Sequence, residues 1–135
     1  MTDTRPTVNV AVVQAAPVLF DREATVAKTR KLCLEAAGQG AQLVLFPEAY
    51  VPAYPRGLSF GVVVGQRRPE GRRLWQRYWA NAVDVPGPAS HALGAVAREA
   101  GVYLAVGVIE RDTQFGGSTL YCTLLYFGPD GRLLA

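Results

Sequence analysis

Apolar and polar positions alternate along the first fifty residues in a pattern that predicts strand, helix and strand in that order. The apolar run Val8–Val13 predicts one strand, and Leu43–Phe46 predicts another that is covered on both faces. Between them, Asp21 predicts a helix N-cap, and apolar residues recur at helical spacing until Gly38 and Gly40. We expect the two strands to be parallel, because a βαβ unit joins them.

The rest of the chain repeats this order after a proline-rich segment. Pro88 suits the first position of a helix, and Gly101 suits its end. The predicted elements are an irregular segment at 58–68, helices at about 69–82 and at 88–100, and strands at 102–109 and 120–127. The first of these helices carries an aromatic stripe of Trp75, Tyr78 and Trp79, which predicts burial in a core or at a subunit interface.

The last residues predict an incomplete hairpin. Gly128–Gly131 is a turn signal, and Arg132–Ala135 begins a return strand. A domain seldom ends a few residues into the second arm of a hairpin, because the first arm then keeps unpaired backbone groups. We therefore expect residues 1–135 to form the N-terminal part of a single longer domain.

Composition and charge narrow the classes of function. Half of the 135 residues are hydrophobic, and the net charge of +3 comes mainly from arginine. Five arginines lie between Arg67 and Arg77, but the mild charge and the lack of a recognition motif favour a solvated or subunit-facing helix over a nucleic-acid surface. No apolar run is long enough to span a membrane, and no signal-peptide core follows the polar start, so we expect a cytoplasmic protein without membrane contact.

The inventory of metal-binding residues is short. His91 is the only histidine, which excludes a His-based metal site and a Ser-His triad. Cys33 and Cys122 are too far apart in sequence to form a metal-ligand motif. No metal site of these kinds is expected.

Glu48 is the main candidate for chemistry. Pro47 stops the second strand, which places Glu48 at the carboxyl end of a core strand, where α/β sheets usually carry their sites. We expect the carboxylate to lie in poor solvent with a raised pKa, as suits a general base or acid. The alternative, equally supported by the residues alone, is a glutamate that has left the strand and bonds to local backbone.

Several motifs in order resemble the nitrilase (carbon–nitrogen hydrolase) superfamily. They are Val10–Pro17, Gly40-Ala41 leading into Leu45–Glu48, and Gly107–Glu110. The segments 46–61, 71–72, 75–79 and 85–88 resemble the true nitrilase branch, which hydrolyses nitriles. The resemblance implies an α/β fold of the α-β-β-α sandwich type, with mixed sheets and outer helices, of which this chain is the N-terminal portion. It also implies a homo-oligomer, either a dimer or a spiral.

The resemblance implies catalysis by a glutamate, a lysine and a cysteine, without a metal or organic cofactor. The thiolate attacks the nitrile carbon to form a thioimidate and then a thioester, the glutamate acts as general base, and the lysine stabilises developing charge. Glu48 matches the family glutamate. The family lysine and cysteine would fall after Ala135, and Lys28, Lys31, Cys33 and Cys122 match neither.

Other interpretations stay open. The enzyme is a nitrilase, an amidase or a cyanide-hydrolysing relative, or else these residues act alone as a non-catalytic binding or assembly module. Tyr54 either contacts the substrate or packs against Pro52 and Pro55. Glu110 is either a second site carboxylate or a structural residue that holds a loop.

Overall fold

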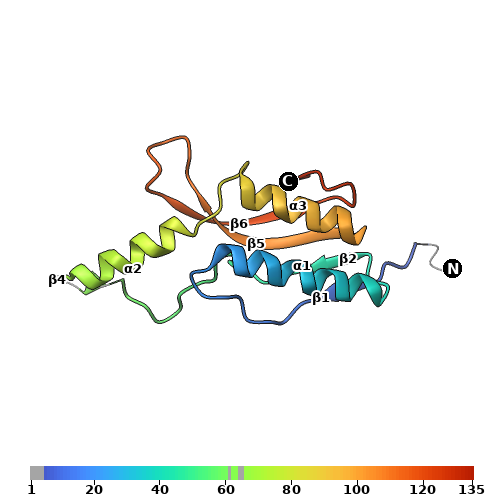
Figure 1. Cartoon of the computed structure of the whole chain (residues 1–135), viewed down its shortest axis with the longest axis horizontal. Helices are drawn as coiled ribbons and strands as arrows, with labels where there is room; N and C mark the ends of the chain where they lie inside the picture. The colour runs from blue at the N-terminus through green and yellow to red at the C-terminus, as the bar shows by residue number, and fades with distance from the viewer. Residues whose placement is uncertain (1–4, 61, 64–65) are drawn as a thin grey trace.

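A mixed four-stranded sheet with two helices on one face forms the body of the molecule (Figure 1). The computed structural model describes residues 5–60, 62–63 and 66–135. The elements are β1 (Val10–Val12), α1 (Arg22–Gly38), β2 (Leu43–Leu45), β3 (Val62–Val63), β4 (Gln66–Arg67), α2 (Pro69–Ala80), α3 (Pro88–Ala100), β5 (Tyr103–Arg111) and β6 (Leu120–Phe127).

The strands lie in the order β1-β2-β5-β6. Strand β2 pairs in parallel with β1 and with β5, so that Leu43 lies between Val10 and Tyr103. Strand β6 runs antiparallel to β5 over eight residue pairs. The predicted parallel pairing of the first two strands is confirmed, and the carboxyl ends of β1, β2 and β5 meet at one edge of the sheet.

The helices begin and end where local sequence predicts. The Asp21 carboxylate accepts a hydrogen bond of 2.8 Å from the backbone N–H of Ala24, which caps α1. Pro88 is the first residue of α3, and Gly101 ends this helix in the left-handed conformation, at φ +66°. Helix α1 buries Thr25, Thr29 and Cys33 against the sheet and α3.

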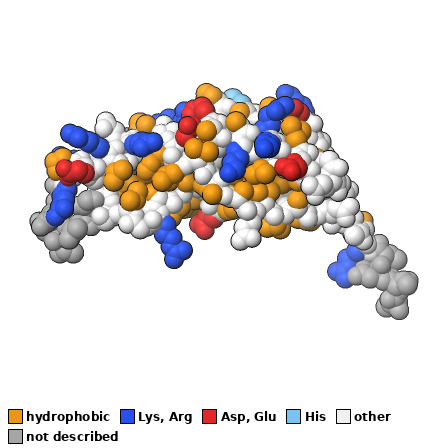
Figure 2. Space-filling model, turned by 60° about the horizontal axis from the view of Figure 1, so that its bottom comes forward, with side chains coloured by type: hydrophobic (Ala, Val, Ile, Leu, Met, Phe, Trp, Pro, Cys, Tyr) orange, Lys and Arg blue, Asp and Glu red, His pale blue; other side chains and the backbone are white. Residues whose placement is uncertain are grey.

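The two faces of the sheet differ in what covers them. On one face, side chains of α1 and α3 enclose a core with alternate residues of the strands; this core includes Cys33, Val44, Leu93, Val96, Leu104, Val106, Val108, Leu125 and Phe127. We call the opposite side the open face. There, Val12 is 72% exposed, Tyr103 52% and Tyr126 44%. Apolar side chains also reach the surface in Figure 2, where they gather between charged groups along the middle of the view.

Helix α2 lies at one end of the molecule, away from α1 and α3 (Figure 1). Tyr78 of this helix packs in a second apolar cluster with Phe20, Ala49, Ala82 and Ile109. Trp75 is 40% exposed in this single chain, because only one side of the helix packs against the cluster. Burial in the core is therefore wrong for Trp75, and burial at a subunit interface stays a prediction.

Three further predictions need correction. The segment at 58–68 was predicted to be irregular, yet it contains the short antiparallel pair β3 and β4; positions 61, 64 and 65 lie outside the described residues. Strand β1 is shorter than predicted at both ends. Strand β5 continues through Glu110 to Arg111, because an additional segment at Val83 pairs with its end. In the described part, no helix is both long and apolar enough to cross a membrane.

Candidate active site

Glu48 lies on a segment that leaves the sheet between β2 and β5. Leu45 pairs with Ala105, and the next parallel contact joins Val51 to Val108. Between these two contacts the segment after β2 is six residues long, whereas the matching part of β5 is three residues long. The surplus forms a protrusion, which we define as residues 47–50 and call the Glu48 protrusion. Its position at the carboxyl end of β2 confirms the predicted placement of Glu48 at that edge.

Local sequence explains why the chain leaves the sheet here. The Phe46 N–H still bonds to the Ala105 carbonyl at 2.8 Å, but Pro47 has no N–H with which to continue the ladder. Ala49 takes a positive φ of 50°, which turns the chain back toward the sheet. The Ile109 N–H then bonds to the Val51 carbonyl at 2.8 Å, and pairing with β5 resumes.

The Glu48 side chain faces an open cavity of about 800 Å³. Ala49 and Tyr50 are buried, whereas Glu48 is exposed, and no hydrogen bond or ion pair joins its carboxylate to another described residue. The predicted location in poor solvent is therefore wrong for this chain, because nothing among the described residues covers the open face. The alternative, in which Glu48 bonds to local backbone, is also wrong for the same part of the chain.

The floor of the cavity is the end of the open face. Apolar side chains of β1, β2 and β6 form most of it, and Gln14 and Cys122 add polar groups; the lining residues are Val12, Val13, Gln14, Leu45, Phe46, Pro47, Glu48, Gly107, Cys122, Thr123 and Leu124. A small organic molecule with an apolar body fits such a surface. A carboxylate within hydrogen-bond reach of a bound molecule is a group that can exchange a proton with it.

Cys122 was predicted to lie inside a strand and is found there, in β6. Its place in the same cavity as Glu48 was not predicted. Cys122 pairs with Ile109 and is exposed, as a free thiol on the open face. Only the register between β5 and β6 could have revealed this, because that register decides which face each residue of β6 occupies.

Tyr54 is 65% exposed and is not part of the cavity lining. Its hydroxyl is near that of Tyr78: burial first, and then Cys122 and Tyr54, raise the pKa of the Tyr78 hydroxyl. Contact between Tyr54 and a substrate, and packing of Tyr54 against Pro52 and Pro55, both stay predictions.

Glu110 is held by a structural contact. The Thr123 hydroxyl donates a hydrogen bond of 2.7 Å to its carboxylate across β5 and β6. Glu110 is half-buried and does not line the cavity, although Thr123 does. This arrangement favours the structural interpretation of Glu110.

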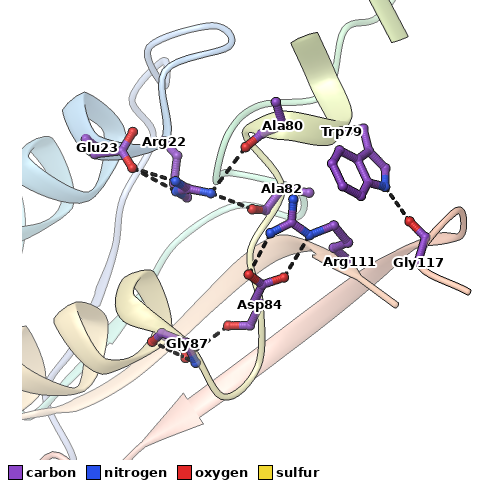
Figure 3. Close-up of polar contacts among 10 residues, drawn as sticks. Arg22, Glu23, Trp79, Ala80, Ala82, Asp84, Gly87, Arg111 and Gly117 are labelled. Atoms are coloured by element: carbon purple, nitrogen blue, oxygen red, sulfur yellow. Dashed lines mark hydrogen bonds and ion pairs between the residues drawn. The ribbon is translucent and has the colours of Figure 1, made fainter. Parts of the chain in front are cut away.

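A polar network fixes the end of α2 and the segment that follows it (Figure 3). Arg111 donates to both carboxylate oxygens of Asp84, at 2.8 and 2.6 Å, and its guanidinium lies 4.4 Å from the centroid of the Trp79 ring. The Trp79 indole N–H donates to the Gly117 carbonyl at 2.5 Å. The hydrogen bonds from Arg111 hold the pKa of Asp84 below its usual range.

This network supports the site from outside. The Val83 N–H bonds to the Ile109 carbonyl at 2.8 Å, so the segment next to Asp84 extends the sheet beyond Val51. Arg22 of α1 reaches the same segment and donates to the Ala82 carbonyl at 2.9 Å. Ala82 and Ile109 belong to the apolar cluster that buries Ala49. The network therefore holds the surface against which the Glu48 protrusion packs.

Two buried groups lie on the helix-covered side. Burial raises the pKa of the Cys33 thiol to about 11, as expected for an inert core cysteine. The Tyr50 hydroxyl is buried without a hydrogen-bond partner among the described residues, and burial raises its pKa. In the part of the chain that the structure describes, no three His, Cys, Asp or Glu side chains are grouped so that they could hold a metal ion.

Comparison with known proteins identifies the family. The family model described as carbon-nitrogen hydrolase matches residues 9–135. The chain belongs to the carbon-nitrogen hydrolase family. This carbon-nitrogen hydrolase chain is 50% identical over 129 residues to the bifunctional nitrilase/nitrile hydratase NIT4A of Nicotiana tabacum, a match that covers 96% of the chain and 36% of the relative.

Two other relatives are similar to the same extent. The aliphatic nitrilase of Sinorhizobium fredii (strain HH103) is 54% identical over 121 residues, covering 90% of the chain and 38% of the relative. Nitrilase 1 of Arabidopsis thaliana is 48% identical over 128 residues, covering 95% and 36%. This carbon-nitrogen hydrolase chain thus spans between 36% and 38% of the length of these three proteins.

Solved structures confirm the fold. An amidase from Nesterenkonia sp. superposes with a TM-score of 0.61 at 20% identity, covering 95% of the chain and 41% of the amidase. A carbon-nitrogen hydrolase from Helicobacter pylori G27 gives 0.61 at 18% identity, covering 95% and 38%. The predicted α/β fold, as the N-terminal portion of the nitrilase type, is confirmed by this agreement and by the mixed sheet.

Proposed function

We propose that this chain supplies the general base, Glu48, of an enzyme that hydrolyses a nitrile to a carboxylic acid and ammonia. The observation that carries the proposal is the position of Glu48 at the tip of a protrusion, over an apolar cavity on the open face, in a chain about half identical to proteins named nitrilases. Among the described residues, the exposed carboxylate is the one acidic group in the cavity lining.

The proposed reaction assigns Glu48 three proton abstractions, each followed by return of the proton. It first takes the proton of a cysteine thiol, whose sulfur attacks the nitrile carbon, and passes this proton to the nitrogen to form a thioimidate. It next takes a proton from water, which adds to that carbon, and returns the proton to the nitrogen. The nitrogen takes the remaining hydroxyl proton and leaves as ammonia, which gives a thioester. A second water, deprotonated in the same way, releases the carboxylic acid, and its proton returns to the sulfur to restore the thiol. A lysine stabilises the charged intermediates.

The cysteine and the lysine of this scheme lie, we propose, after Ala135. Cys33 is buried behind the sheet and cannot reach the cavity. Cys122 does line the cavity, but it lies within β6 and does not follow a strand, as the family's nucleophile does. The uncovered apolar side chains of the open face support further polypeptide on this side, because patches of this kind are usually covered.

The test is Glu48→Gln in the full-length protein. The amide keeps the size of the side chain but cannot accept a proton, so we expect the fold to persist and kcat to fall by orders of magnitude, about 10²–10⁴. Product analysis should detect the carboxylic acid and ammonia. Full retention of kcat in the variant would refute the role of Glu48.

A second candidate reaction follows from the named relatives, several of which are bifunctional nitrilase/nitrile hydratases. Release of the product as an amide stops the scheme before ammonia leaves. Turnover of one nitrile, with acid and amide measured together, separates the two reactions. Turnover of the matching amide as substrate separates both from an amidase.

We also propose that the protein forms a homo-oligomer, as the family resemblance implies. The exposed aromatic side chains at the α2 end support this, since Trp75 is 40% exposed and Phe115 is 84% exposed. Light scattering of the full-length protein measures the subunit number. A monomer at all concentrations would refute the proposal.

A further inference from the structure

Gly107 is the residue of β5 that lies against the Glu48 protrusion. Its N–H bonds to the Pro47 carbonyl at 3.2 Å, and its own carbonyl accepts from the Val51 N–H at 3.2 Å. A single residue therefore holds both ends of the segment that carries Glu48. Gly107 also belongs to the cavity lining.

The protrusion approaches Gly107 too closely for any side chain. A Cβ atom built on Gly107 would lie 2.6 Å from the Glu48 Cα and 2.6 Å from the Ala49 nitrogen, and closer still to the Pro47 carbonyl oxygen. All three are backbone atoms, so no rotamer change relieves the overlap. Contact at an ordinary 3.4 Å would require the protrusion to move by about 0.8 Å at Glu48 and by more at the Pro47 carbonyl.

Space, and not backbone conformation, is the reason for glycine here. Gly107 does not belong to the glycines with positive φ, and its strand pairs regularly with Leu124 of β6. Alanine at position 107 would thus fit the strand itself, and its methyl group would displace the segment that lies over the strand. The displaced group would be the backbone of Glu48.

We infer that Gly107 is a positioning residue for the reaction: its missing side chain sets how deeply the Glu48 carboxylate sits over the cavity. The inference rests on the proposed role of Glu48 as general base. A displacement of about 1 Å at a catalytic group can cost about 100-fold in rate. Gly107→Ala should therefore lower kcat by about 100-fold and change KM little, because Gly107 acts on the base and not on the substrate.

Gly94 provides a matched control. A Cβ atom at Gly94 would overlap the Gly131 carbonyl oxygen and approach the Phe127 ring at 3.3 Å, so the steric conflict is comparable. Gly94 lies in α3 on the helix-covered side, and it does not line the cavity. Gly94→Ala should lower the resistance to denaturant as Gly107→Ala does, while kcat per folded molecule stays unchanged.

The decisive measurement uses four forms of the full-length protein: the parent, Gly107→Ala, Glu48→Gln and the double variant. If Gly107 acts through Glu48, Gly107→Ala has no further effect on kcat once Glu48 is replaced. Two results would overturn the inference: kcat of Gly107→Ala within twofold of the parent, or the same loss in both backgrounds. Retained activity of Glu48→Gln would instead refute the proposed function.

A second variant keeps the test informative if Gly107→Ala does not fold. Ala49 has a positive φ, which glycine adopts without steric cost, so Ala49→Gly lets the protrusion move away from the new methyl group. The pair Gly107→Ala/Ala49→Gly should fold with Glu48 still displaced and kcat still low. If kcat recovered together with folding, Gly107 would have a structural role only, and the inference would be overturned.

Discussion

The two faces of the sheet are built from the same strands and similar apolar residues, yet only one of them is closed. Leu104 is 1% exposed on the helix-covered face, and its neighbour Tyr103, which points the other way, is 52% exposed. The closed face is covered by helices that lie next to these strands in sequence. The open face has no such cover in the described residues, and it carries Glu48. The candidate site therefore lies on the side of the sheet that the described residues leave uncovered.

The cysteines offer the largest contrast between the faces. Cys33 lies in the closed core with a pKa raised to about 11, so about one thiol in a thousand is ionised at pH 8, and access is blocked as well. Cys122 is exposed on the open face. Iodoacetamide should label Cys122 orders of magnitude faster than Cys33 in the folded 135-residue chain.

Mass spectrometry of tryptic peptides measures this labelling, and unfolding in guanidinium should make the two rates similar. Equal rates in the folded chain would contradict the difference between the faces. The same measurement on the full-length protein sharpens the comparison, because protection of Cys122 there would identify the open face as covered by the remaining polypeptide.

Truncation of adjacent residues on β5 compares the faces energetically. Leu104→Ala removes a fully buried side chain from the closed core and should lower the free energy of unfolding by about 2–5 kcal/mol. Tyr103→Ala removes a half-exposed ring from the open face and should cost about 1 kcal/mol or less in the 135-residue chain. Urea unfolding measures both, and equal losses would contradict the burial difference.

Sequence alone predicts the closed face better than the open one, because its determinants are local. Asp21, Pro88 and Gly101 fix the helix ends through bonds and torsions within a few residues. Pro47 likewise predicts the strand end before Glu48. The return of the chain at Val51 could not be predicted, since it depends on register with a strand more than fifty residues away.

The side-chain environment at the open face could not be predicted from the sequence for the same reason. The carboxyl end of an apolar strand predicts poor solvent only when both faces of that strand are covered, and Glu48 is exposed because one is not. Cys122 lies in the cavity lining because of the register in which β6 pairs with β5. The apolar pattern of a single strand does not specify that register. Gly107 appeared as part of a motif, but its role required the distance to the Glu48 backbone.

The Asp84–Arg111 pair joins the two regions and should have an intermediate effect. Both side chains are partly buried, with 29% and 18% of their surfaces exposed. Asp84→Asn should cost about 1–3 kcal/mol at pH 7, because it removes charge-assisted bonds and leaves Arg111 without its counter-charge. Urea unfolding at pH 7 measures the loss.

The pair also predicts a pH dependence. Arg111 lowers the pKa of Asp84 in the folded state relative to the unfolded state, so the unfolded state binds the proton more readily. The contribution of Asp84 is therefore present above its ordinary pKa, about 3.9, and is lost as the pH falls through the lowered value. The difference between parent and Asp84→Asn should shrink below pH 4, and a constant difference would contradict this origin.

The smallest effects are expected at the ends of the helices that close the covered face. Gly38 ends α1 without a positive φ, and no atom lies within 4 Å of the position that an alanine methyl group would take, so Gly38→Ala should raise the free energy of unfolding by about 0.5–1 kcal/mol. Gly101 after α3 has equally open surroundings, but its φ is +66°. Gly101→Ala should therefore lower stability by about 1 kcal/mol, because alanine is strained there. Thermal unfolding of the two variants side by side separates the effect of backbone conformation from that of packing. A change in Tm of the same sign in both variants would contradict backbone conformation as the cause.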